Sequence, residues 1–239
     1  MATRIRHGAA SGRSWRGPLL GAAFSFLASA AAQVAPSPDE IAAYKGLHAA
    51  AQRGDVAAIE RLAASKAALG ARDGNGRTPL HVATFAHQFR AVRALIQAGA
   101  DTGALDKDRY DAVTIAAVAN DEETLRLLLG LGASARLVTS RYDGTALIAA
   151  AQLGHDGVVR QLIAASAPLD HVNNLHWTAL IEAVVLGDGR SHHQAVVAAL
   201  LKAGANTALA DSSGKTPLQL ARDQGYVEIV KLLERAGAK

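Results

Sequence analysis

The residues best suited to chemistry are two adjacent histidines, His192 and His193, in a polar stretch that covers residues 187–194. Together with Asp188 they could provide imidazole and carboxylate ligands for a metal ion. Adjacent histidines seldom converge on one ion without further ligands, so the favoured interpretation is a polar surface loop that is available for contact with a partner. A metal-dependent or enzymatic factor built on residues 187–194 is the alternative hypothesis.

The rest of the sequence contains no recognisable catalytic constellation. It has no cysteine, and the G-x-S-x-G, H-E-x-x-H and P-loop motifs are absent. The glycines on either side of Asn75 are not followed by the spacing of a dinucleotide fingerprint. We therefore expect no catalytic residue, no bound metal and no cofactor.

Basic charge is concentrated at the N-terminus. Residues 1–32 include Arg4, Arg6, Arg13 and Arg16 and no acidic side chain, so the remaining chain carries 21 basic and 21 acidic residues. A nucleic-acid-binding protein usually keeps a positive surplus in its folded part. The balanced charge of the remaining chain indicates that nucleic acid is not its partner.

The order of residues within 1–32 is typical of a secretory signal peptide. An uncharged apolar stretch at 18–32 follows the arginines and ends in small residues, which places cleavage near Ala30 to Gln33. This stretch has about 15 residues, fewer than the ~20 that a membrane-spanning helix needs, so we expect no permanent membrane anchor. An organellar transit peptide is the alternative, but the continuous apolar block favours export to the periplasm or the exterior.

Residues 33–40 are predicted to form a linker and the start of the first helix. Ser37 is a suitable N-cap, Pro38 fits the first helical position, and Glu40 stands where a capping box requires it.

The remaining residues, 41–239, repeat a short pattern at a period of roughly 33 residues. A Thr or Asp followed by apolar residues opens the segments 78–83, 111–116, 145–150, 178–183 and 216–221. A Gly-Ala pair after a second apolar run closes units at 99–100, 132–133, 204–205 and 237–238. The Thr or Asp suits a helix N-cap, and the Gly suits a left-handed C-cap. Each unit is therefore predicted to form a helix, a turn, a second helix and a loop, and the pairs must stack to bury their apolar faces.

This pattern resembles the ankyrin repeat, whose T-P-L-H-x-A signature matches the segment Thr78-Pro79-Leu80-His81-Val82-Ala83. The resemblance implies an all-α solenoid of about six helix-turn-helix units with projecting β-turn or hairpin loops. The approximate repeats are 41–72, 73–105, 106–139, 140–172, 173–210 and 211–239. Some positions depart from the pattern: Lys45 replaces the capping Thr of the first unit, and Lys66 and Ser166 replace the closing Gly of the first and fourth.

The resemblance also assigns roles to particular residues. His48 and His81 hold the fourth position of the signature, where a histidine usually forms hydrogen bonds to the backbone of a neighbouring loop. Partners of the family commonly bind the loop tips and the concave face of the first helices. The residue before each cap is expected to point outward from its loop. With Tyr142, which lies in the same kind of loop, this rule selects the predicted partner-binding residues Arg77, Tyr110, Tyr142, Trp177 and Lys215.

Tyr, Trp and Arg are enriched at binding hot spots, which supports this choice, although each aromatic ring could instead pack on the next loop. The sequence as a whole predicts an exported, monomeric, non-catalytic scaffold that binds an unidentified protein. A secreted effector that acts on a host protein is the second alternative.

Overall fold

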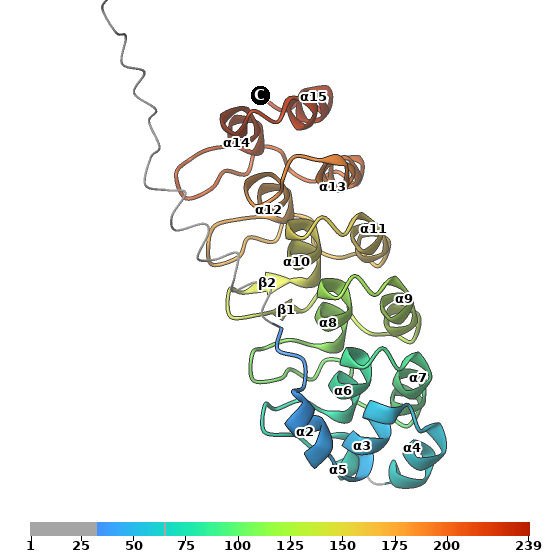
Figure 1. The fold of residues 1–239 in the computed structure, drawn as a ribbon. Coiled ribbons are helices and arrows are strands. Elements are labelled where there is room, and N and C mark those ends of the chain that lie inside the picture. Colours follow the sequence, from blue (N-terminus) through green and yellow to red (C-terminus); the bar gives the residue numbers. More distant parts are fainter. Residues whose placement is uncertain (1–32, 65) are drawn as a thin grey trace, which may run out of the picture.

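The computed structural model describes residues 33–64 and 66–239, so the predicted signal peptide lies outside the described residues. The described chain is a stack of helix pairs, and the predicted all-α solenoid is confirmed (Figure 1). The first helices of the pairs are α3 (Gly46–Arg53), α6 (Pro79–Phe85), α8 (Ala112–Val118), α10 (Ala146–Gln152), α12 (Ala179–Val185) and α14 (Pro217–Gln224). The second helices are α4 (Val56–Leu62), α7 (Phe89–Gln97), α9 (Glu122–Gly130), α11 (Asp156–Ala164), α13 (Ser191–Lys202) and α15 (Val227–Arg235).

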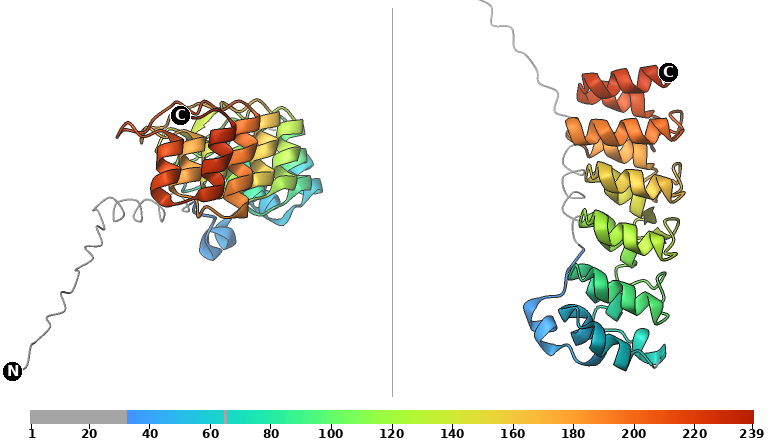
Figure 2. Two further views of the ribbon diagram at one scale, coloured as in Figure 1. Left: turned by 90° about the horizontal axis from the view of Figure 1, so that it is seen from above. Right: turned by 90° about the vertical axis from the view of Figure 1, so that its right-hand side faces the viewer.

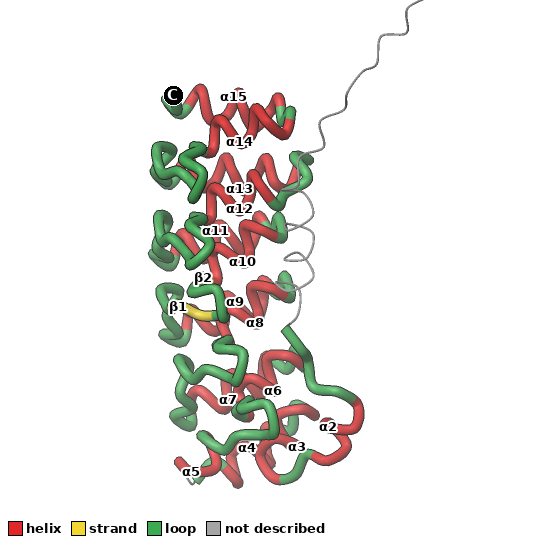
Figure 3. Tube along the Cα trace, turned by 90° about the vertical axis from the view of Figure 1, so that its left-hand side faces the viewer, coloured by secondary structure: helices red, strands yellow, loops and turns green. Residues whose placement is uncertain are grey.

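The helices form two layers. Each first helix packs against the first helix of the next pair, and each second helix packs in the same way, so the layers run side by side along the stack (Figure 2). The longer loops project along one edge, next to the first helices (Figure 3). Two short helices lie outside this pattern: α2 (Pro38–Ala43) precedes the first pair, and α5 (Lys66–Leu69) follows it. Within the described residues no helix is long and apolar enough to span a bilayer.

The core is built from small and branched apolar side chains that recur once in each repeat. Leu80, Leu147 and Leu180 are at most 1% exposed. A buried alanine three residues after each of these leucines lets neighbouring first helices approach closely; these alanines are Ala83, Ala150 and Ala183. The pattern explains why so few aromatic residues are needed to fill the interior.

The predicted N-caps are confirmed. A side-chain oxygen at the first signature position accepts a hydrogen bond from the backbone N–H three residues later, which satisfies one of the unpaired donors of the helix start. The capping residues are Thr78, Asp111, Thr145, Thr178 and Thr216. Ser37 and Glu40 form the predicted capping box at α2. Lys45 occupies the N-cap position of α3 and, as expected, its side chain forms no capping hydrogen bond.

The closing glycines take the left-handed conformation that their position predicts, with φ of 98° at Gly99, 91° at Gly132 and 92° at Gly204. Ser166 stands at the same point of its repeat and adopts a φ of 61°. A residue with a Cβ is strained in this region, so the fourth repeat stores conformational energy at this turn.

Replacing Ser166 with Gly should therefore raise the free energy of unfolding by about 0.5 kcal/mol, since the relief of backbone strain slightly exceeds the entropy that glycine adds to the unfolded chain. Urea denaturation followed by circular dichroism would measure the change. The matched control is Gly132→Ala, where nothing lies within 4 Å of the added Cβ, so only the backbone conformation is tested. That variant should lose stability, and a gain in it would contradict the interpretation.

Successive loops are joined by a ladder of backbone hydrogen bonds, which we call the tip ladder. Lys107 N–H donates to the carbonyl of Asn75 at 3.0 Å, and Ser140 N–H donates to that of Arg109 at 2.9 Å. The Asn174 N–H continues the ladder to the carbonyl of Tyr142 at 3.0 Å. In the third of these loops, β1 (Val138–Thr139) and β2 (Gly144–Thr145) pair antiparallel as a small hairpin.

Histidines add further bonds between loops, as the sequence predicts. His48 Nε2 lies 3.0 Å from the carbonyl oxygen of Arg77, and His81 Nε2 lies 3.0 Å from that of Tyr110. The Thr78 N–H donates to Nδ1 of His81, so the ring is a neutral imidazole with its proton on Nε2. Burial lowers the pKa of His81, which is consistent with this form. The structural role of both histidines is confirmed.

The 187–194 insertion differs from its prediction as a loop. Helix α13 begins at Ser191 and has 12 residues, whereas α7, α9, α11 and α15 have 9 each. Residues 191–194 of the insertion, which include both histidines, therefore belong to α13, and only residues 187–190 form a loop. The prediction that all of 187–194 forms a loop is therefore wrong for residues 191–194, where the extra residues lengthen α13 relative to the other second helices.

Candidate functional site

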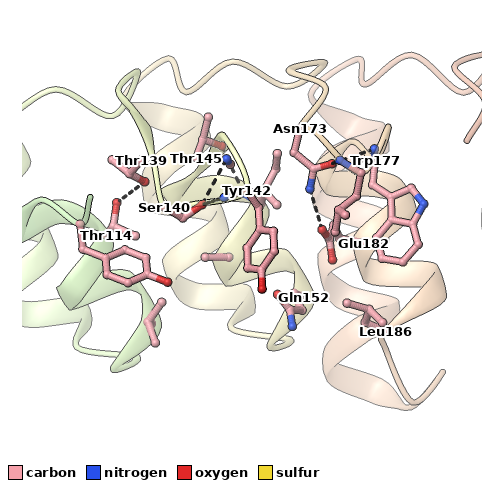
Figure 4. A pocket seen from close by; sticks show the side chains of 16 residues that line it. Thr114, Thr139, Ser140, Tyr142, Thr145, Gln152, Asn173, Trp177, Glu182 and Leu186 are labelled. Atoms are coloured by element: carbon pink, nitrogen blue, oxygen red, sulfur yellow. Dashed lines mark hydrogen bonds between the residues drawn. The ribbon is translucent and has the colours of Figure 1, made fainter. Parts of the chain in front are cut away.

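Three of the five predicted partner-binding residues lie around one pocket on the loop side of the first-helix layer. Tyr110 precedes α8, Tyr142 lies in the β1–β2 hairpin, and Trp177 precedes α12. The cavity itself has a volume of about 50 Å³, and the hollow around it, with the open solvent at its mouth, measures about 590 Å³. Side chains of α8, α10 and α12, among them Val118 and Ile148, complete the walls. The structure thus brings together aromatic residues from three consecutive repeats (Figure 4).

Glu182 is the residue of this pocket that the sequence analysis missed. It lies on α12 at a position where the other repeats have apolar side chains, namely Val82, Ile115, Ala149 and Leu220. Its side chain is 3% exposed and lies between Tyr142 and Trp177, next to Asn173 (Figure 4). An acidic residue at an otherwise apolar signature position was the available signal.

The Glu182 carboxyl group is incompletely satisfied. Asn173 Nδ2 donates to its Oε1 at 2.9 Å, but its Oε2 is buried and has no hydrogen-bond partner among the described residues. Burial raises the pKa of Glu182 to about 7, and the bond from Asn173 only partly opposes this effect. The side chain therefore gains or loses its charge near neutral pH, at the wall of an aromatic pocket.

Asn173 explains how the loop accommodates this acid. In other loops an aspartate accepts backbone N–H bonds from the residues two and four positions later, as Asp73 and Asp211 do. Asn173 Oδ1 accepts the same two bonds, each at 3.0 Å, while its Nδ2 is left to donate to Glu182. An aspartate here would place two carboxylates in contact. The equivalent residue in the hairpin is also neutral, Ser140, so neither loop adds a carboxylate to the pocket.

The prediction that Arg77 points outward is wrong. Its side chain is 1% exposed, and its guanidinium forms ion pairs with Asp73 at 2.7 Å and with Glu40 of α2 at 2.6 Å. The Tyr44 hydroxyl donates to Asp73 Oδ2 at 2.8 Å. Hydrogen bonds from Arg77 and Tyr44 lower the pKa of Asp73 even though burial alone would raise it. Arg77 turns inward because this cluster joins α2 to the first loop, so its side chain is not presented to a partner at the loop tip.

Tyr110 also differs from its prediction, because it is 8% exposed and forms the wall of the pocket instead of projecting from the loop. Lys215 is exposed as predicted, but its Nζ pairs with Asp223 of α14 at 2.6 Å, away from the pocket. The partner-binding roles of Tyr110, Tyr142, Trp177 and Lys215 stay predictions.

The two histidines of the insertion face different partners. His192 Nδ1 lies 3.3 Å from Asp156 Oδ1, whereas His193 Nδ1 lies 2.9 Å from Asp188 and its Nε2 lies 3.0 Å from the carbonyl oxygen of Gln152. Across residues 33–64 and 66–239, no group of three or more His, Asp or Glu side chains is arranged to hold a metal ion. The insertion thus serves to connect α13 with neighbouring helices.

Comparison with known proteins places this stack in a family. Models of ankyrin repeats match residues 47–139 and 113–208, and a single ankyrin repeat matches 213–239. The ankyrin repeat protein YahD of Escherichia coli (strain K12) is 44% identical over 100 residues, which are 41% of this chain and 50% of YahD. The chain thus matches only half the length of that relative.

Solved structures of ankyrin repeat domains have the same fold as this chain. An ankyrin repeat domain from Acinetobacter baumannii AYE is 50% identical with a TM-score of 0.76, over 81% of this chain and 98% of that one. The ankyrin repeat domain of human ASB11 is 25% identical with a TM-score of 0.66, over 82% of this chain and 85% of that one. The family models cover most of the chain, and the solved structures share its stack of helix pairs. The chain therefore belongs to the ankyrin repeat family.

Proposed function

We propose that this chain is a non-catalytic scaffold that is exported from the cytoplasm and binds a partner protein through its loop tips and first-helix layer. The observation that carries the proposal is the pocket in which Tyr110, Tyr142 and Trp177 gather from three repeats. Aromatic side chains of this kind provide large contact areas at low entropic cost, and they are enriched at the centres of interfaces. Ankyrin repeats in general bind proteins, which supports the same role.

Export is supported by the order of residues 1–32, in which arginines, an apolar stretch and small residues follow one another. The balanced charge of the remaining chain supports a protein partner over a nucleic acid.

Site-specific photocrosslinking in the native host would test the binding surface. A photoreactive amino acid placed at Trp177 or Lys215 should crosslink to a discrete partner, because both positions belong to the proposed surface. The matched control is Arg160 of α11, in the second-helix layer, whose side chain is 60% exposed. Equal crosslinking from Arg160, or none from Trp177 and Lys215, would remove the assignment of the surface.

Cell fractionation followed by mass spectrometry of the N-terminus would test export. The mature protein should be recovered outside the cytoplasm with an N-terminus between residues 30 and 34. A cytoplasmic protein that retains residues 1–32 would contradict the export proposal, and it would leave the binding surface unaffected.

A further inference from the structure

The charge of the pocket indicates what kind of group it would accept. Glu182 is the one Asp, Glu, Lys, Arg or His residue among the side chains that form its wall. A buried carboxylate oxygen without a partner costs free energy, which a bound donor would recover. We propose that this pocket binds the side-chain ammonium group of a lysine on the partner protein, with Glu182 Oε2 as its acceptor. This proposal rests on the proposed protein-binding function and names the chemistry of the partner.

The single free oxygen favours lysine over arginine. A guanidinium group binds a carboxylate best through two parallel hydrogen bonds, which require both oxygens. Glu182 Oε1 already accepts from Asn173, so only Oε2 is available. A compact ammonium group can use one acceptor oxygen and direct its other protons elsewhere.

The walls of the pocket suit the rest of a lysine side chain. Val118, Ile148 and Leu186 provide apolar contact for a four-carbon stem. The aromatic rings of Tyr142 and Trp177 lie on either side of Glu182 in Figure 4, where ring faces can stabilise a cation. Ala149 leaves the required space, because it occupies the signature position that holds the larger Val82, Ile115 or Leu220 in other repeats.

No resident cation neutralises Glu182 from the helices that pack against α12. Helix α10 carries no ionisable side chain. On α14, Arg222 pairs with Glu234, and Asp223 pairs with Lys215. On α13, His192 and His193 contact Asp156 and Asp188, and Lys202 is exposed. The pKa shift of Glu182 accordingly has burial and the Asn173 bond as its causes, with no nearby charge.

Calorimetric titration of the full chain would test the pocket without knowledge of the partner. The probes are n-butylammonium and Nα-acetyl-lysine methylamide, with n-butylguanidinium and n-butanol for comparison. Both amines should bind at pH 8, the guanidinium at least tenfold more weakly, and the alcohol not measurably. Binding should weaken about tenfold at pH 6, where protonation of Glu182 removes the charge. If n-butylammonium binds but Nα-acetyl-lysine methylamide does not, the assignment to a lysine of a protein is overturned.

Two variants test separately the negative charge of Glu182 and the empty volume of the pocket beside Ala149. Glu182→Gln keeps the acceptor for Asn173 but removes the charge, and Ala149→Leu keeps the charge but fills the pocket. Each should reduce amine affinity at least tenfold, whereas Glu228→Gln on the exposed surface of α15 should not change it. Unchanged affinity in both pocket variants, with thermal unfolding showing that they are folded, would overturn the proposal. A partner crosslinked from Trp177 without amine binding would leave the scaffold function intact and refute only the lysine site.

Discussion

Replacing Arg77 with alanine should lower the free energy of unfolding of the N-terminal repeat by about 3 kcal/mol or more, because it leaves a buried carboxylate without its cation. Asp73, 8% exposed, would keep only the hydrogen bonds from Tyr44 and the loop backbone. Glu40 of α2 would lose its ion pair with the loop. Hydrogen exchange would locate the effect, since repeat stacks unfold locally: protection should fall in α2, α3 and α4 and persist in α12 and α14.

The control for this prediction is Arg109→Ala. Arg109 forms a similar loop ion pair with Asp143, but both side chains are 49% exposed, so its loss should cost less than about 1 kcal/mol. Equal losses in the two variants would show that burial of Arg77 contributes nothing, and the description of the α2 cluster as a structural joint would be wrong.

The second large effect concerns Glu182→Gln. At pH 8 this variant should be more stable than the original chain by about 3 kcal/mol, since the charged form of Glu182 is buried without a counterion. The value follows from a pKa raised by burial from 4.5 to about 7 in a side chain that is 3% exposed. Glutamine keeps an acceptor for Asn173, so the loop should retain its conformation.

The raised pKa of Glu182 makes the stability of the folded chain depend on pH. Between pH 4.5 and 7 the folded chain holds a proton on Glu182 that the unfolded chain has released, so this group lowers stability as pH rises through that window. The difference between the two proteins should therefore be near zero below pH 4.5 and should reach its full value above pH 7. Urea denaturation at closely spaced pH values measures this difference, and a constant difference from pH 4 to 8 would contradict the assigned pKa. Glu228→Gln, with its exposed side chain, is the control.

The cost of Glu182 also bears on function. A leucine or isoleucine, as at Leu220 or Ile115, would fill the same position without a buried charge. A group that lowers stability in an otherwise regular stack is typical of a binding site, where stability and function compete.

The features that could be read from the sequence are local ones. A cap such as Thr78 needs only the N–H three residues later, and a left-handed turn needs only its own glycine, so spacing predicts both. The ankyrin resemblance then predicts the stack, because each repeat packs against its two neighbours through the same helix faces.

Other features depend on partners far along the chain. Arg77 turns inward because Glu40 lies 37 residues before it, and no rule based on the loop alone reveals this pair. The pocket requires three loops to be placed next to one another. Helix α13 begins at Ser191, and its N-cap Arg190 forms no side-chain cap, so the Ser, Thr, Asp or Asn expected at the position before the helix is missing. Glu182 was visible as an exception in the repeat alignment, but its consequence depended on the neighbouring Ala149 and Asn173.

The tip ladder has a mechanical consequence. Its bonds join the loops from Asn75 to Asn174, but within the described chain no backbone hydrogen bond connects the loop tip at 173–177 with the one at 211–215. A load applied by a partner at one of the first four tips is therefore shared among all four. The last repeat is attached through its helices and the Tyr226 hydroxyl bond to Gly187, so we expect it to detach before the other repeats when the stack is pulled.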